Sequence, residues 1–408
     1  MISLNKYLYN YFLFLFSIIP LTIIIGSAVS FVNIILIDLS FIILLVYKKN
    51  FYFLKNKTII YFLILYIYLI FNSIISIDYS ESFSRNLGFL RIIILFVAFN
   101  FFYYQKFFFK KMFKLWLLIL SILIFDVFVE FFYGKNILGY DGAEYGKRIV
   151  SFFKDEPVVG GFIYSFSLIL IGFFINQKNR YKYYTLLIMI LFLISIFITG
   201  ERSSSLKAFL AAGIFVILYK EIKLKKKISI FFVILLVLFS LILNSAYLKH
   251  RFTKPILDQK SITRYFDLYQ SGFQVFKNNK IFGVGNKNYR VATCNQDKIV
   301  SIPIQNKDKY VCTTHPHQIY FELLSEHGLI GTIIILFIFY KLIFSKIIRT
   351  ISEKNYLKIG PLIYLTLSFL PVIPSGAFFS SFLLTLFAIN LSIFYAYDKD
   401  MNVFKINK

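Results

Sequence analysis

The chain has 408 residues, of which 58% are hydrophobic and 20% are aromatic. Soluble domains hold roughly 45–50% apolar residues, so this composition excludes an ordinary soluble domain and indicates an integral membrane protein. The formal net charge of +25 would suit a nucleic-acid-binding protein, but the lysines and arginines recur in alternate loops instead of covering one face or tail, which argues against that class.

About twelve apolar stretches are long enough, at about 17–25 residues, to cross a bilayer core of ~30 Å. They are too long and too continuously apolar for barrel strands, so the sequence predicts an all-α polytopic membrane protein with about twelve transmembrane helices. We predict a retained first helix rather than a signal peptide, because no small-residue cleavage site follows it. The predicted spans lie near residues 10–29, 31–47, 58–77, 86–104, 112–133, 158–176, 182–199, 203–219, 228–247, 328–345, 358–376 and 379–397.

Basic side chains follow every second predicted helix. By the positive-inside rule, these loops and both termini are predicted to be cytoplasmic. The basic residues include Lys48, Lys49, Lys110, Lys111, Lys178, Lys225, Lys226, Lys346, Arg349 and Lys399. The outer loops are then residues 78–86, 134–157, 200–204, 248–327 and 374–380. The sequence thus divides into 1–247 with nine helices, an outer segment 248–327, and 328–408 with three helices and a tail.

Arg91 in the fourth predicted span, and Asp126 and Glu130 in the fifth, need partners, because a charge is costly inside a membrane. We predict that these three residues only pair with one another and hold the bundle together.

A polar cluster follows the fifth predicted helix, on the outer side. Arg148, Asp155 and Glu156 stand just before the sixth helix and are typical of a group that lines a cavity. The alternative is a salt bridge at the lipid interface.

Arg202 lies in the short turn Thr199–Ser205 between two predicted membrane helices, beside a glycine and three serines. Its fixed fork of donors suits phosphate oxygens, and each charge-assisted hydrogen bond contributes about 1.5–3 kcal/mol. The alternative is a pair with Glu201 or with a lipid headgroup.

The outer segment 248–327 is too long for an inert connection and is predicted to be a small folded cap. Ile262, Phe266, Tyr269, Phe273 and Phe276 recur at helical spacing, which predicts a helix over residues 258–277 whose apolar face lies on the membrane or packs on the bundle.

Other residues of the cap are candidates for binding or for holding its fold. Arg264 stands near the start of the predicted helix, where the alternative is a solvated surface charge. Arg290 follows the glycine turn Gly283–Gly285 and is a possible supporting residue. An oxidising outer compartment would permit a disulfide between Cys294 and Cys312, and the alternative is two free thiols.

A histidine-rich loop runs into the tenth predicted membrane helix. A short helix is predicted over 317–327, with His317 in its first turn and Gly328 turning the chain into the span. The imidazole of His317 can accept a proton from a hydroxyl group, and the alternative is a histidine that only caps the helix. His315 and His327 have no Cys, Asp or Glu set at ligand spacing around them, so no metal site is predicted.

Together these segments resemble the bacterial O-antigen polymerase and O-antigen ligase superfamily, over nearly the whole chain. The most specific part is His315-Pro316-His317-Gln318 followed by Glu326 and Gly328, which is similar to the family's His-Asn-x-x-Leu and Glu-x-Gly pattern. The Gly-Glu-Arg-Ser of residues 200–203 and the glycine turn occur in the expected order.

The resemblance implies site residues. It implies that His317 activates or orients an acceptor hydroxyl, with Glu326 and Gly328 fixing the register, and that Arg202 and Arg264 hold a donor diphosphate. Two positions depart from the family: no tryptophan follows Arg264, and Gln318 replaces the usual asparagine. Arg148, Glu156, His315, Gln318, Glu326 and Arg290 are expected supporting residues.

The implied reaction is inverting, metal-independent glycosyl transfer at the periplasmic face of the bacterial inner membrane, without a cofactor. The donor is a glycan on undecaprenyl diphosphate. A lipid-linked repeat unit as acceptor makes the protein a polymerase, which the His-Pro-His form and the cluster before Pro157 favour. Lipid A-core as acceptor makes it a ligase. A chain-length regulator is a possible partner, and a flippase or transporter is the alternative of another class.

Overall fold

The computed structural model describes residues 4–105, 107–154, 156–176, 182–219, 222–253, 259–294 and 310–405. These residues form helices and no strand. The α-helices are α1 (Lys6–Ser17), α2 (Ile19–Ile25), α3 (Ser27–Lys48), α4 (Lys57–Ile74), α5 (Tyr79–Leu87), α6 (Phe89–Phe102), α7 (Phe108–Tyr133), α8 (Val159–Asn176), α9 (Lys182–Ile198), α10 (Arg202–Leu218), α11 (Leu224–Asn244), α12 (Ala246–Phe252), α14 (Gln259–Asn278), α15 (Tyr289–Cys294), α16 (Ile319–Leu342), α17 (Ile347–Ser352), α18 (Tyr356–Ser368) and α19 (Ser381–Ala396). Short 3₁₀ turns occupy Tyr52–Lys55, Ala143–Tyr145, Ser151–Phe153 and Phe344–Lys346.

The number of membrane spans differs from the predicted number. Among the described residues, 7 helices are long and apolar enough to cross a membrane, or up to 8 if α1 and α2, bent by 42°, form one span. Helices α9, α18 and α19 lie at predicted positions but are shorter than the predicted spans, and α10 has the predicted length, shifted by one residue. An all-helical, multi-pass membrane protein is therefore supported, whereas the number twelve, the orientation and the three-segment division remain predictions.

The predicted span 358–376 is too long, because α18 ends at Ser368. Pro371 and Pro374 follow within six residues, and proline disfavours the continuation of a helix because it lacks the backbone N–H donor. The chain from Phe369 to Ser380 forms a loop instead. We call this loop the proline loop. It contacts residues His315 to His317, which we call the histidine segment.

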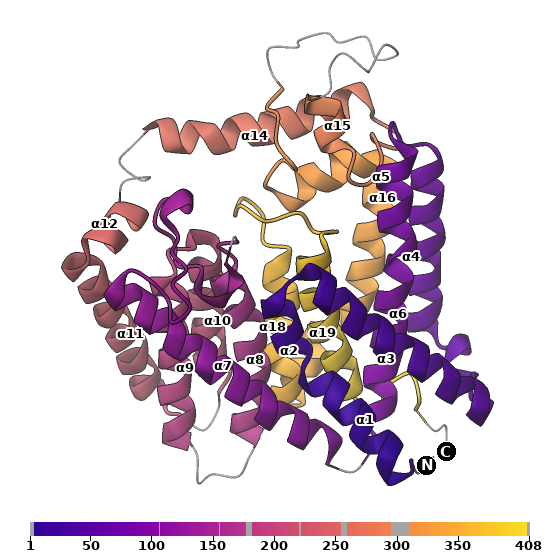
Figure 1. Cartoon of the computed structure of the whole chain (residues 1–408), viewed down its shortest axis with the longest axis horizontal. Coiled ribbons are helices and arrows are strands. Elements are labelled where there is room, and N and C mark those ends of the chain that lie inside the picture. Colours follow the sequence, from indigo (N-terminus) through magenta and orange to yellow (C-terminus); the bar gives the residue numbers. More distant parts are fainter. Residues whose placement is uncertain are drawn as a thin grey trace.

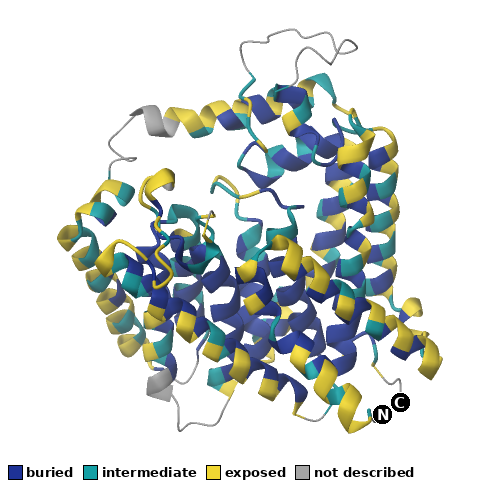
Figure 2. Cartoon of the chain, in the orientation of Figure 1, coloured by how far each residue is buried: buried dark blue, intermediate teal, exposed yellow. Residues whose placement is uncertain are grey.

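At the centre of the bundle, α18 packs against α8 and α19, and α19 packs against α6 and α8. Figure 2 shows buried residues concentrated there, and α8 is 78% buried whereas the outer helix α11 is 11% buried. Glycines let α8 and α18 approach closely: a Cβ added to Gly360 would overlap the carbonyl oxygen of Leu168, and one added to Gly172 would overlap that of Tyr356. Small residues at such contacts are typical of membrane helix pairs.

Gly360→Ala is expected to lower the free energy of unfolding by about 1–3 kcal/mol, because the added methyl group forces α8 and α18 apart. Thermal unfolding in one detergent measures the change. Gly213→Ala on α10 is the matched control: its Cβ would meet only Phe231, at 3.7 Å. Equal melting temperatures for the two variants would contradict this account of the helix contact.

A cap of short helices covers one end of the bundle. In Figure 1, α14 and α15 lie across the top, whereas α1 begins at the opposite end, where the segment after α19 also lies. One face of α14 buries Leu268 and Val275, the latter with Val284 of the glycine turn. The other face bears Phe266, which is 65% exposed, and Tyr269, which stacks on Phe321. The predicted apolar face therefore packs partly on α16; the side chain of Ile262 lies outside the described residues.

The first turns of α16 hold the cap in place. Backbone N–H groups of Val284 and Gly285 donate to the carbonyls of Ser325 and Glu326, both at 2.9 Å. Gly283 and Gly328 have φ of 71° and 62°, and a Cβ on either would overlap the facing backbone. The glycine turn and Gly328 are therefore glycines because two chain segments cross there without room for side chains.

Two further contacts bear on the sequence predictions. Cys294 and Cys312 form a disulfide, as predicted.

Arg91, Asp126 and Glu130 do not pair with one another, so the prediction that they do is wrong. Glu130 accepts hydrogen bonds from the backbone of Val150 and Ser151 at 3.1 and 2.6 Å, and Asp126 accepts from Ile137 N at 2.9 Å. The two acids therefore fix the loop that carries Arg148, because that loop offers unpaired N–H groups beside them.

Candidate active site

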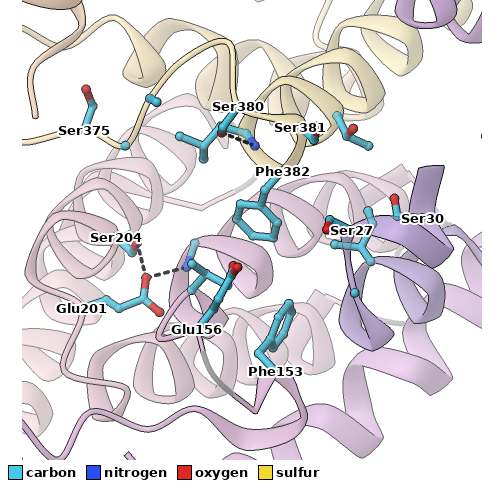
Figure 3. Close-up of a pocket in the computed structure, with 18 of the residues that line it drawn as sticks. Ser27, Ser30, Phe153, Glu156, Glu201, Ser204, Ser375, Ser380, Ser381 and Phe382 are labelled. Carbon is cyan, nitrogen blue, oxygen red and sulfur yellow. Dashed lines mark hydrogen bonds between the residues drawn. The ribbon is translucent and has the colours of Figure 1, made fainter. Parts of the chain in front are cut away.

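A cavity of about 760 Å³ opens between the bundle and the cap. Its wall combines the α2–α3 junction, the loop before α8, the first turn of α10 and the proline loop (Figure 3). Cationic side chains outnumber acidic ones: Arg85, Arg91, Arg148, Lys154, Arg202 and Arg251 line it, against Glu156 and Glu201. The cavity is therefore suited to an anion.

Glu201 organises the turn that presents Arg202. Its carboxylate accepts hydrogen bonds from Gly160 N at 2.5 Å, Gly161 N at 3.0 Å and Ser204 Oγ at 2.9 Å. The carboxylate thus caps the N-terminus of α8, where a negative charge is favoured. The predicted alternative of a Glu201–Arg202 pair is wrong, since no ion pair joins these two described residues, and the guanidinium of Arg202 faces the cavity instead.

Three arginines gather at this end of the cavity, which we call the α10 end. Arg202 lies over the ring of Tyr265, 5.9 Å from its centroid, and Arg251 donates to the carbonyl of Gly200 at 3.1 and 3.3 Å. Arg148 has a buried Nε without a partner among the described residues. Both Arg148 and Arg251 line the cavity, and burial and the charge of Arg148 lower the pKa of Arg251.

His317 lies at the edge of the same cavity, ahead of α16. The prediction that it stands in the first helical turn is wrong: Gln318 is the N-cap, and its Oε1 accepts from Tyr320 N and Phe321 N at 2.8 and 3.0 Å. His317 has φ of 56°, and its carbonyl accepts from Ser375 N of the proline loop at 2.8 Å. Because α16 begins only after Gln318, His317 lies outside the helix, and no described residue hydrogen-bonds its ring nitrogens.

His315 has a different role from His317, although their ring centroids lie 4.1 Å apart. Its Nε2 faces the carbonyl oxygen of Ser375 at 3.1 Å, and its Nδ1 faces Thr314 Oγ1 at 2.9 Å. Nε2 therefore carries the proton. Burial, chiefly, lowers the pKa of His315 to about 3. It is a neutral residue that ties the histidine segment to the proline loop.

The pKa of His317 is lowered from the ordinary value, first by burial and then by the positive charges of Arg264 and Arg148. The imidazole is therefore neutral at pH 7 and takes up a proton only as the pH falls through that lowered pKa.

Arg148→Gln is expected to raise the pKa of His317, because a nearby positive charge disfavours the imidazolium. NMR titration of the 4 histidines measures it, with the exposed Lys249→Gln as control; a pKa unmoved by Arg148→Gln would contradict the proximity.

Of the other predicted site residues, some line the cavity and others lie outside it. Glu156 lines the cavity, and Asp155 lies outside the described residues. Arg264 is exposed on α14 and does not line the cavity, although its charge acts on His317. Arg290 is exposed on α15 and lines neither of the two large pockets. Glu326 is buried and accepts from Tyr289 N at 3.3 Å, so it supports the glycine turn.

An apolar groove of about 1440 Å³ adjoins the cavity. Its walls come from α10, α11, the apolar face of α14 and the start of α16, and Arg202, Tyr265 and Pro374 line both spaces. The groove therefore begins where the arginine cluster ends. Its lining is largely aliphatic and aromatic, which suits a hydrocarbon chain.

Sequence reasoning missed four residues of the cavity as site residues: Arg251, Arg85, Ser375 and Ser381. Arg251 follows the ninth predicted span directly, and a charge at a membrane edge on the outer side was the available signal. No spacing rule connects the two serines with the histidine segment, because the proline loop lies about 60 residues away in the chain.

Residues 187–336 match the family described as O-antigen ligase. No curated protein matches the chain. The matched range contains Arg202, Arg251, Arg264, His317 and Glu326, so the resemblance seen in the residues is confirmed over the part that carries these side chains. Arg148 and the proline loop lie outside it.

Proposed function

We propose, starting from the O-antigen ligase match, that this protein is a membrane glycosyltransferase that polymerises a surface glycan. The donor is a glycan on undecaprenyl diphosphate, and the acceptor is a second lipid-linked repeat unit. The observation that carries the proposal is one cavity that collects Arg148, Arg202, Arg251 and His317 and opens into an apolar groove.

The donor fits the two spaces together. The polyprenyl chain lies in the apolar groove, and the diphosphate sits at Arg202, where groove and cavity meet. Arg148 and Arg251 supply further donors; the unpartnered Nε of Arg148 is one of them. Guanidinium groups bind phosphate oxygens in bidentate fashion, and charge-assisted hydrogen bonds are the stronger ones.

The transfer reaction then requires only that the acceptor hydroxyl is positioned and that the charge of the leaving diphosphate is stabilised. The acceptor hydroxyl oxygen attacks the anomeric carbon of the donor as the bond from that carbon to the diphosphate oxygen breaks. The proton of the hydroxyl passes to the neutral imidazole of His317, and the arginines stabilise the negative charge that develops on the leaving diphosphate. Attack from the face opposite the diphosphate inverts the anomeric centre.

A ligase is the second candidate function, and the description of the matched family favours it. Donor and cavity are the same for both, and only the acceptor differs. A ligase transfers the glycan to lipid A-core.

Reconstitution of the purified protein with a synthetic undecaprenyl-diphosphate repeat unit tests the proposal. A ladder of lipid-linked oligomers, resolved by gel and mass spectrometry, is the expected result without lipid A-core. Product that appears only when lipid A-core is added would establish the ligase. No product under either condition, together with movement of the lipid across the bilayer, would instead favour a flippase.

A further inference from the structure

The cavity has a second cationic end, away from the α10 end. Arg85 of α5 and Arg91 of α6 line it together with Ser27 and Ser30 of α3. In Figure 3, Ser27 and Ser30 lie on the opposite side of the view from Glu201 and Ser204. We call this region, defined by Arg85, Arg91 and Ser381, the α5–α6 end.

An aromatic pair stands between the two ends. Phe153 and Phe382 both line the cavity, with ring centroids 6.3 Å apart, and Figure 3 shows them between the Glu201 side and the Ser27 side. An anion bound at one end is thus separated from an anion at the other, and a sugar face can rest on the rings.

The two arginines of the α5–α6 end share one hydroxyl group as a hydrogen-bond acceptor, while Asp38 acts on Arg91, and Glu81 and Glu326 act on Arg85, only through their charges. Nη1 of Arg85 and Nη2 of Arg91 both donate to the single hydroxyl oxygen of Ser381, at 2.7 and 3.2 Å. Nε of Arg91 is buried without a partner. No carboxylate among the described residues lies within the 4.0 Å of an ion pair with either guanidinium.

Two like charges on one hydroxyl are unfavourable unless an anion joins them. Each guanidinium has five N–H donors, so most of the donors of the pair remain unused. The stack of Arg91 on Phe31, 4.8 Å from guanidinium carbon to ring centroid, fixes its position without neutralising it. The pair therefore suits a multiply charged oxyanion, which could accept hydrogen bonds from both arginines at once.

The neighbouring surface is apolar and open. α2 and α3 meet at Gly26, which has φ of 147°, and the break places Ile25 and Phe31 in the cavity wall, where they are 60% and 45% exposed. A hydrocarbon chain attached to the oxyanion can therefore leave the α5–α6 end along α2 and α3. This route is separate from the groove between α10 and α11.

We propose that Arg85, Arg91 and Ser381 form a second subsite that binds the diphosphate of the lipid-linked acceptor. The inference rests on the proposed glycosyltransferase function and deepens it: donor and acceptor each bring a lipid diphosphate, and the cavity holds one at each end. The acceptor glycan then extends past Phe153 and Phe382 toward His317.

Binding stoichiometry tests the subsite without any transfer. Native mass spectrometry with undecaprenyl diphosphate is expected to show two equivalents on the wild-type protein, one on Arg85→Gln/Arg91→Gln and one on Arg148→Gln/Arg202→Gln. Lys249→Gln, which removes an exposed positive charge from α12, is expected to keep two. Two equivalents on the Arg85→Gln/Arg91→Gln variant would overturn the inference, as would displacement of the second equivalent by phosphatidylglycerol at equal concentration.

Steady-state kinetics then show whether donor or acceptor binds at the α5–α6 end. A donor whose acceptor hydroxyl is methylated can only donate, and a repeat unit joined to its diphosphate by a C–P bond can only accept. In Arg85→Gln/Arg91→Gln, the KM for the acceptor is expected to rise at least about tenfold, with the donor KM and kcat within about twofold of wild type. Arg85→Lys/Arg91→Lys keeps the charges and is expected to recover part of the loss.

The outcomes separate the two proposals. A rise in the donor KM alone would place the donor at the α5–α6 end and overturn the inference. A raised KM seen only for phosphorylated lipid A-core would show that the arginines hold a phosphate of that acceptor, which also overturns it. Absence of transfer by the wild-type protein would refute the proposed function, while loss of one bound equivalent in the variant would still establish a second lipid-diphosphate site.

Discussion

His317→Asn is expected to lower kcat for glycan transfer by about 10²–10⁴-fold, because the acceptor hydroxyl loses the group that takes its proton. Asparagine is the appropriate replacement: His317 has φ of 56°, and asparagine tolerates that region better than most residues. The backbone bond from Ser375 N to the carbonyl of residue 317 should persist. The KM for the donor is expected to change little, since the arginines remain.

Initial rates with reconstituted protein, measured against pH, check this expectation. Wild-type activity should fall as the pH drops through the lowered pKa of His317, because protonation removes the base. The residual activity of His317→Asn should lack that acidic limb. His250→Gln, which changes an exposed histidine on α12, is the matched control. A variant with full kcat and an unchanged acidic limb would show that His317 is not the base.

Arg202→Gln is expected to reduce kcat/KM for the donor by about 10²-fold, since one charge-assisted contact contributes about 1.5–3 kcal/mol and the leaving group also loses stabilisation. KM for the donor should rise and kcat should fall, because in the proposed mechanism the diphosphate is bound in the ground state and gains charge in the transition state. Arg202 lies where the groove meets the cavity, so the loss should exceed that for Arg264→Gln, whose side chain is exposed outside the cavity.

Donor kinetics with a fixed, saturating acceptor measure the effect. Arg202→Lys should recover binding better than rate, because a lysine supplies the charge without the bidentate fork. Lys249→Gln keeps the same charge change on the outer face of α12 and should leave donor kinetics at the wild-type level. A loss in Arg264→Gln that matches or exceeds the loss in Arg202→Gln would move the diphosphate from the cavity to the surface of α14.

The proline loop holds the histidine segment in place. His315 binds the carbonyl of Ser375, His317 accepts from Ser375 N, and Glu322 of α16 accepts from Phe378 N at 2.9 and 3.1 Å. The same loop brings Ser381 to Arg85 and Arg91. A displacement of this loop would therefore disturb both His317 and the α5–α6 end, which is why each variant needs a melting temperature beside its rate.

Much of the molecule follows from the sequence alone. Long apolar stretches can only satisfy their backbone within a bilayer as helices, so the helical class and the approximate place of the long apolar helices were predictable. The short helix α5 was not, since residues 78–86 were predicted to be an outer loop. The period of Phe266, Tyr269 and Phe273 predicted α14, and Gly328 predicted the turn at which α16 is kinked. The sequence also singled out His317 and Arg202, both of which line the cavity.

The tertiary structure decided what these residues face. Asp126 and Glu130 bind loop backbone instead of Arg91, and Glu201 caps α8 instead of pairing with Arg202, because unpaired N–H groups offer a buried carboxylate several bonds at once. Whether Arg264 or Arg251 lines the cavity depends on helix rotation and packing, which local pattern does not encode. The meeting of Arg85 and Arg91 with Ser381, nearly 300 residues away, arises only when α5, α6 and α19 pack together.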